Sequence, residues 1–188
     1  LLTVARGVAT PKAAMSINEI VTDYLNSAEF FQLQQHHRDV RVEACLDENL
    51  LAISGSQVHI AKAVMNLVSN AAEAIQDGGR VTIATANRYV DAPLSGYDDI
   101  RVGEYAVLTV SDNGSGIASN DLERIFEPFY TRKVMGRSGT GLGLAVVWNV
   151  VQDHNGYIDV KTDSDGTRFD LYFPITREEL MEKPHGTS

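Results

Sequence analysis

Two glycine-rich turns on either side of an aromatic and basic segment constrain this 188-residue chain most. The first turn, residues 112–116, follows the apolar run 105–110, and the second, residues 139–144, precedes the apolar run 145–151. Glycine lets the backbone come close to a ligand. A glycine turn that enters a helix also offers free N–H groups and the positive end of the helix dipole to phosphate. With residues 126–133 between the turns, the pattern predicts two walls of a nucleotide site and a lid.

Either turn alone would be weak support for such a site. An Asp-Asn-Gly sequence is more often a hairpin turn than a binding site. The second turn is not the dinucleotide fingerprint, because Gly143 follows Gly141 too closely, and it is not a Walker loop, because no Lys-Ser or Lys-Thr pair follows it. The order of both turns around the intervening segment is far more specific than either motif.

Composition narrows the class of protein. The net charge is −9 and the pI about 4.9, which argues against binding nucleic acid or an anionic membrane through bulk charge. Hydrophobic residues make up 44% of the chain, enough for the core of one domain. No apolar run reaches membrane-spanning length, so we expect no direct membrane contact by this domain. The single cysteine, Cys45, excludes an internal disulfide. We interpret it as a structural thiol and expect a cytoplasmic location.

Apolar periodicity and turn signals predict the order of the elements. Helices are expected over residues 16–31, 56–76, 120–125 and 142–154, with Ser119 capping the third. Strands are expected over residues 40–46, 80–90, 104–110, 157–162 and 167–174. Polar connections are expected over residues 32–39 and 91–103.

The helix over residues 56–76 carries an unusual polar row. Asn66, Asn70 and Glu73 are spaced so that they share one face, beside the apolar stripe. Asparagine is a poor helix former that prefers caps and turns, so two of them in mid-helix need a reason. They are either two solvated asparagines or a row of amide oxygens offered to a hard cation and to phosphates.

With this helix in place, the sequence resembles the catalytic and ATP-binding domain of bacterial sensor histidine kinases. The same superfamily includes DNA gyrase, the Hsp90 chaperone and the MutL repair protein. Four motifs match in order, namely an asparagine box at residues 66–70, a first glycine box at 112–116, a phenylalanine box at 126–130 and a second glycine box at 139–144. Residues 166–169 match the family's last hairpin, and the resemblance covers roughly residues 40–174.

This resemblance implies a fold of the α+β class, a two-layer sandwich of the Bergerat type. Its mixed, mostly antiparallel sheet of about five strands would pack on three helices. A mobile ATP lid would lie over about residues 120–138. The phenylalanine box would anchor this lid, with Phe126 and Phe129 in the core and not on the nucleotide.

The resemblance also implies how the adenine of ATP or ADP is bound. Asp112 would accept a hydrogen bond from the adenine amino group, which selects ATP over GTP because guanine has a carbonyl there. Thr167 would support the same edge of the base through water. Ile117 and Ala71 would line the apolar base pocket.

At the phosphates, the resemblance implies that Asn70 gives its amide oxygen to Mg²⁺, with Asn66 beside it and Glu73 in the same network. Lys133 and Arg132 would reach the outer phosphates, and we expect Asn66, Asn70 and Lys133 to be the catalytic residues. The N–H groups around Gly141, Leu142 and Gly143 would cradle the phosphates. The remaining expected nucleotide contacts are Gly114, Gly116, Tyr130, Thr131, Ser138, Gly139, Thr140 and Leu144.

The sequence departs from the pattern of the related proteins in two ways that affect the expected activity. The related ATPases have a glutamate general base one turn before the metal-binding asparagine, where this chain has Asn66, so efficient ATP hydrolysis is not expected. The chain's five histidines (His36, His37, His59, His154 and His185) lack the context of a phosphoacceptor. We therefore expect them to be structural or solvated.

The acceptor histidine is expected in a dimerisation domain upstream, in a longer parent protein that forms homodimers. Residues 1–31 are interpreted as the end of that helical hairpin and its connector, residues 32–176 as the ATP-binding domain, and residues 177–188 as a loose tail. The expected function is to supply the γ-phosphate of Mg-ATP to that histidine, for relay to an aspartate of a response regulator receiver domain. Two alternatives are an ATP-driven conformational clamp like the chaperone and gyrase domains, and a degenerate domain that only binds partners.

Overall fold

A five-stranded sheet forms one layer of the computed structural model, which describes residues 11–130 and 143–178. In this sheet β2 pairs in parallel with β4, and the other neighbouring pairs are antiparallel. From one edge to the other, the strands are β2 (Val40–Cys45), β4 (Gly79–Val90), β7 (Gly103–Asp112), β9 (Gly166–Pro174) and β8 (Tyr157–Asp163). The expected mixed, mostly antiparallel sheet is confirmed.

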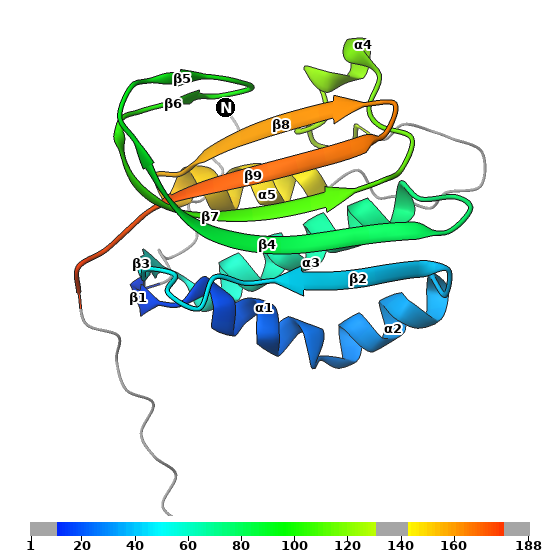
Figure 1. Cartoon of the computed structure of the whole chain (residues 1–188), viewed down its shortest axis with the longest axis horizontal. Helices are drawn as coiled ribbons and strands as arrows, with labels where there is room; N and C mark the ends of the chain where they lie inside the picture. The colour runs from blue at the N-terminus through cyan, green and yellow to red at the C-terminus, as the bar shows by residue number, and fades with distance from the viewer. Residues whose placement is uncertain (1–10, 131–142, 179–188) are drawn as a thin grey trace, which may run out of the picture.

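Three helices form the second layer, on one face of the sheet (Figure 1). They are α1 (Ile17–Leu25), α3 (Gln57–Glu73) and α5 (Gly143–Asp153). The apolar stripe predicted for α3 is buried, with Val64 and Val68 fully inside the core. Ser56 caps this helix by accepting a hydrogen bond from the backbone N–H of His59. The two-layer α+β fold is therefore confirmed.

The single helix predicted over residues 16–31 is wrong, because two helices occupy this region. The first helix, α1, ends at Leu25, and Ser27 is the N-cap of the second helix, α2 (Ala28–His36). Its Oγ accepts from the backbone N–H of Phe30 at 3.2 Å and donates to the carbonyl of Tyr24 at 2.6 Å, a local pattern that favours a helix start over a continuous helix. The predicted polar connection over residues 32–39 is helical as far as His36.

The expected domain boundary after residue 31 falls inside α2. On its N-terminal side, β1 (Ala13–Met15) pairs with β3 (Ile53–Gly55), and α1 buries Ile17 and Val21 in the same core as α3. Residues from Met15 onward thus share one hydrophobic core with the rest of the sheet and helices. Residues 1–10 and 179–188 lie outside the described part of the chain.

The predicted loop over residues 91–103 contains a small hairpin, β5 (Leu94–Ser95) with β6 (Asp99–Ile100). It helps cover the sheet face opposite the helices, where a second apolar cluster is made by Val90, Ile100, Tyr105, Val107 and Tyr172. Alternate side chains of β7 and β9 point to this face, and the hairpin shields their apolar groups from water. Asp159 Oδ1 fastens the hairpin by accepting from the backbone N–H of Tyr97 at 3.1 Å.

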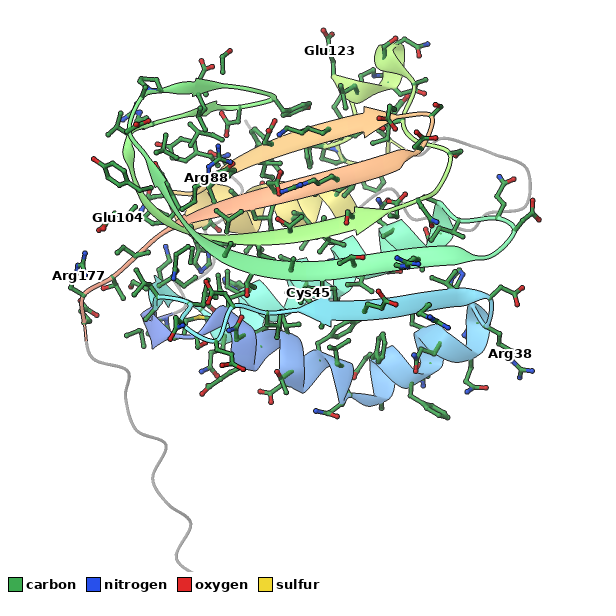
Figure 2. The ribbon with its side chains drawn as sticks, in the orientation of Figure 1. Arg38, Cys45, Arg88, Glu104, Glu123 and Arg177 are labelled. Carbon is green, nitrogen blue, oxygen red and sulfur yellow. The ribbon has the colours of Figure 1, made fainter. Side chains whose placement is uncertain are left out.

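Two further details differ from the sequence-based expectations. Cys45 is exposed at the end of the edge strand β2, so its interpretation as a structural thiol is wrong (Figure 2). Ser119 is the first residue of the short helix α4 (Ser119–Leu122), whose N-cap position is taken by Ala118. At the other end of the fold, Arg177 forms an ion pair with Glu104 at 2.8 Å, which ties the segment after β9 to the start of β7.

His154 is a structural residue, as expected, and it joins two helices. It lies buried after the end of α5. Its Nε2 accepts from the backbone N–H of Ser56 at 3.0 Å, and its Nδ1 donates to the carbonyl of Val150 at 2.7 Å. Both ring nitrogens are thus used to hold the start of α3 against the end of α5.

Acid is expected to destabilise the fold through His154. Burial lowers its pKa below the ordinary 6.5, and the charges of Lys12 and His59 act in the same direction. A histidine with a lowered folded pKa stabilises the fold above its unfolded pKa, and this stability is lost as pH falls through that value. The free energy of unfolding should therefore fall as pH drops below about 6.5, the ordinary histidine value, and fall less in His154→Gln. His36→Gln, on exposed α2, is the control, and equal pH slopes in the wild type and His154→Gln would contradict this reasoning.

Candidate functional site

A row of side chains across four neighbouring strands places Asp112 next to Thr167. In the register of the sheet, Val81 of β4 is opposite Asp112, Asp112 is opposite Thr167, and Thr167 is opposite Thr162 of β8. Residues directly opposite in antiparallel strands point to the same face. Because Val81 is fully buried in the core between sheet and helices, the row lies on the helix side of the sheet.

Asp112 is a desolvated carboxylate at the last position of β7. Burial raises its pKa above the ordinary value of 3.8, while backbone N–H groups of Gly114 and Thr167 act in the opposite direction by favouring the charged form. The bond from the Gly114 N–H to Oδ1 is 2.9 Å long. The site therefore presents a hydrogen-bond acceptor in a half-buried setting, where such a bond is stronger than in water.

Glycines let two chain segments meet beside this carboxylate, the first glycine turn and the turn between β8 and β9. Gly116 has a φ of 78°, and a Cβ there would lie 2.0 Å from the carbonyl oxygen of Asp163. Gly166 has a φ of 138°, and a Cβ there would lie 1.9 Å from the carbonyl oxygen of Asp112. The first glycine turn thus packs against the β8–β9 turn at distances that no side chain allows.

Thr162 is a member of this site that the sequence reasoning missed. Its Oγ1 accepts from the backbone N–H of Ile117 at 2.8 Å and lies 2.9 Å from the hydroxyl oxygen of Thr167. It therefore connects the first glycine turn to the last hairpin. The available signal was the hairpin register, which places Thr162 opposite Thr167 once the turn between β8 and β9 is known.

The asparagine face of α3 meets the start of α5. Asn66 donates from Nδ2 to the carbonyl of Lys62 at 2.9 Å, and a Cβ at Gly143 would lie 3.3 Å from its Oδ1. Asn70 and Glu73 are half-buried on the same side of α3. Ala71 is 2% exposed and belongs to the core. The asparagine box and the end of the second glycine box are thus neighbours.

Of the two phenylalanines of the phenylalanine box, only Phe126 lies in the core as expected. The ring of Phe126 packs against Trp148 and Phe169, with centroids 5.2 and 6.3 Å away, and against Tyr97 of the β5–β6 loop at 5.2 Å. Phe129 is 75% exposed, so its predicted place in the core is wrong. Its φ of 64° belongs to the left-handed region, which orients this side chain differently from that of Phe126.

Tyr130, an expected nucleotide contact, is held by α4 and the residues after it. Its hydroxyl donates to Asp121, and the guanidinium of Arg124 lies over its ring, 4.6 Å from the centroid. Gly143 and Leu144 open α5. The other expected contacts in this region lie outside the described residues, namely Thr131, Arg132, Lys133, Ser138, Gly139, Thr140, Gly141 and Leu142.

Comparison with known proteins places the chain in a family. Residues 55–177 match the model of the family described as histidine kinase-, DNA gyrase B-, and HSP90-like ATPase. The chain is 34% identical over 163 residues to the sensor histidine kinase ZraS of Salmonella typhi, covering 86% of this chain and 31% of that protein. It is 32% identical over 161 residues to the sensor kinase CckA of Brucella abortus, covering 85% of this chain and 17% of that protein.

Solved structures agree on the fold. The catalytic domain of the histidine kinase ThkA matches with a TM-score of 0.69 at 22% identity, over 88% of this chain and 97% of that one. Within the described residues, none of the helices is both long and apolar enough to cross a membrane. The chain spans about a third or less of the two curated relatives named above. From the family match and these identities, the chain belongs to the family of histidine kinase-, DNA gyrase B- and HSP90-like ATPases.

Proposed function

We propose that this domain binds Mg-ATP, with its adenine held by the row that contains Asp112 and Thr167. The observation that carries the proposal is the desolvated carboxylate of Asp112 opposite a buried threonine, next to a turn of two glycines. A carboxylate accepts from the 6-amino group of adenine and has no favourable partner in the 6-carbonyl of guanine. Ile117, fastened to Thr162, would border the base.

For the phosphates, we propose that the amide oxygen of Asn70 binds Mg²⁺, with Asn66 beside it. The fit rests on the donor set, because amide oxygens, water and phosphate suit this hard cation. Asn66 Oδ1 faces Gly143, so the asparagines lie beside the start of α5, where a helix N-terminus favours phosphate. When bound, Mg²⁺ would neutralise charge on the phosphates. Lys133, Arg132 and the N–H groups around Gly141 are proposed to complete the site.

We further propose that the parent protein is a homodimeric, cytoplasmic-facing histidine kinase. This domain would supply the γ-phosphate to a histidine of an upstream dimerisation domain, for relay to a response regulator aspartate. The proposal is supported by relatives that are named sensor kinases. Asn66, in the position of a general base, favours phosphotransfer over the hydrolysis that an ATP-driven clamp needs.

If this domain binds ATP and the acceptor histidine lies in an upstream domain, the 188-residue chain alone has a defined expected behaviour. It should bind ATP but not label itself with γ-phosphate. Phosphoryl transfer needs the acceptor nitrogen in line with the phosphorus at near-attack distance. Both ring nitrogens of His154 are hydrogen-bonded to backbone groups inside the fold. His36 Nδ1 lies 2.8 Å from the carbonyl oxygen of Gln32 on α2.

The measurement is labelling with γ-³²P-ATP, followed by acid treatment, with and without the upstream hairpin of the parent in the same chain. Acid-labile phosphohistidine is expected only with the hairpin, and Lys133→Ala should weaken that transfer more than it weakens ADP binding. Stoichiometric acid-labile labelling of this chain alone would show that one of its own histidines is the acceptor.

A further inference from the structure

The tip of the β5–β6 hairpin contacts both faces of the sheet. We propose that Tyr97, at this tip, is a positioning residue for the phosphate half of the nucleotide site, and that it acts through Phe126 and Trp148. The phosphate half is the part of the site beside Asn66 and the start of α5. This inference rests on the proposed function, since it takes the phosphates of ATP to bind there.

One side chain fixes the hairpin tip on the sheet face opposite the helices. Asp159 alternates along β8 with Val160, which belongs to the core between sheet and helices, so Asp159 points to the opposite face. There Asp159 is 9% exposed, and its Oδ1 accepts from the backbone N–H of Tyr97 at 3.1 Å. A Cβ at Gly96 would lie 2.5 Å from the same oxygen, so the tip approaches Asp159 more closely than a side chain there would allow.

The ring of Tyr97 lies on the helix side of the sheet. Its centroid is 5.2 Å from that of Phe126 and 6.5 Å from that of Trp148, both in edge-to-face geometry. All three side chains pack against the core between sheet and helices. Because β8 is the edge strand and β6 lies beside it (Figure 1), the hairpin tip wraps around the edge of the sheet. Edge-to-face contacts at such separations are favourable, so the ring is held as well as the backbone.

Phe126 and Trp148 connect this tip to the phosphate half of the site. Trp148 lies on α5, about 7.5 Å along the helix axis from Gly143, whose Cβ would approach Asn66. Phe126 belongs to the segment that leads to Tyr130, an expected nucleotide contact. The rings of Phe126 and Trp148 are 5.2 Å apart, so Tyr97 packs on both members of the pair that joins this segment to α5.

The base half of the site has a different support. Asp112 and Thr167 lie opposite each other on β7 and β9, two strands paired from Tyr105 to Asp112. Loss of a ring at the edge of β8 should leave that pairing in place. A shift of α5 would instead move the helix start that is proposed to face the phosphates. Tyr97 is therefore expected to affect the binding of phosphates and not the binding of the base.

The test compares the affinities for Mg-ATP and for adenosine, which lacks the phosphates. Calorimetry gives the first, and competition of adenosine against ATP gives the second. Tyr97→Ala should weaken ATP binding about fivefold to tenfold, the loss expected for one or two aromatic contacts, and should weaken adenosine binding less than about twofold. Tyr97→Phe, which keeps the ring, should retain the wild-type ratio of the two affinities.

Asp159→Ala tests the same coupling from the opposite face of the sheet. It removes the acceptor that holds the backbone of the tip, so the ratio of ATP to adenosine affinity should fall in the same direction. Trp148 is the chain's one tryptophan, so its fluorescence reports the packing at this contact. Its emission should move to longer wavelength in Tyr97→Ala, because water gains access to the indole.

Tyr89→Ala is the matched control, since it removes a tyrosine ring that is 67% exposed on β4. Tyr97→Leu gives the same comparison as Tyr97→Ala if alanine disturbs the fold. A purely structural role would weaken ATP and adenosine alike. An unchanged ratio of the two affinities in Tyr97→Ala and Tyr97→Leu would overturn the inference and leave the proposed function standing. Failure of the wild type to bind ATP would overturn the proposed function and, with it, this inference.

Discussion

Replacing Gly166 with alanine is expected to lower the free energy of unfolding by about 2–4 kcal/mol and to abolish measurable nucleotide binding. Gly166 has a φ of 138°, which L-residues rarely adopt, and the added Cβ would lie 1.9 Å from the carbonyl oxygen of Asp112. The backbone would therefore have to move at Asp112, the residue proposed to bind the adenine base. For a chain of this size, the melting temperature should fall by about 5–15 °C.

Gly103→Ala is the matched control for this prediction. Gly103 begins β7, and a Cβ there would lie 3.4 Å from the Tyr105 hydroxyl oxygen, close to ordinary contact. Thermal unfolding and calorimetric titration with ATP on the same samples would separate stability from binding. A Gly166→Ala variant with the wild-type melting temperature would contradict the close packing of β9 against Asp112.

Asp112→Asn is expected to weaken ATP binding about tenfold to a hundredfold. The amide can present its donor where adenine also has a donor, and the lost hydrogen bond to a charged group is worth about 1.5–3 kcal/mol. The substitution should not lower the stability of the fold. Burial raises the pKa of Asp112, so above that pKa the ionised carboxylate costs stability, and this cost is relieved as pH falls through the folded pKa. The neutral amide avoids it.

Asp165→Asn is the control for Asp112→Asn, since it removes the same charge from an exposed position in the turn after β8. Calorimetry should give wild-type ATP affinity for this control. Asp112→Asn is expected to melt no lower than the wild type at neutral pH. Unchanged ATP affinity in Asp112→Asn would remove Asp112 from base recognition, even if the domain still bound ATP.

The elements that carry the site could be predicted because their signals are local. The spacing of apolar residues and the turn residues can be seen within a short stretch of sequence for each of three elements. These are the strand before Asp112, the helix with Asn66 and Asn70, and the last hairpin. The positive φ of Gly116 and of Gly166 fits the use of glycine at the two turns. The mixed, mostly antiparallel character of the sheet followed from the resemblance to a known fold and not from periodicity.

Features that depend on three-dimensional register could not be predicted. Phe126 and Phe129 belong to one short segment, and only the path of the chain after α4 decides that one ring packs on Trp148 while the other is exposed. The role of Thr162 requires the pairing of β8 with β9. The helix break at Ser27 depended on a side chain that competes for local backbone groups.

The central claim is that the row of Val81, Asp112, Thr167 and Thr162 forms an adenine-selective ATP site. The most direct measurement is calorimetric titration of the wild-type chain with ATP and with GTP, each with Mg²⁺ under the same conditions. We predict saturable binding of one ATP per chain, with GTP bound at least about tenfold more weakly because its 6-carbonyl would face the Asp112 carboxylate. Equal affinity for the two nucleotides, or no binding of ATP, would contradict the account.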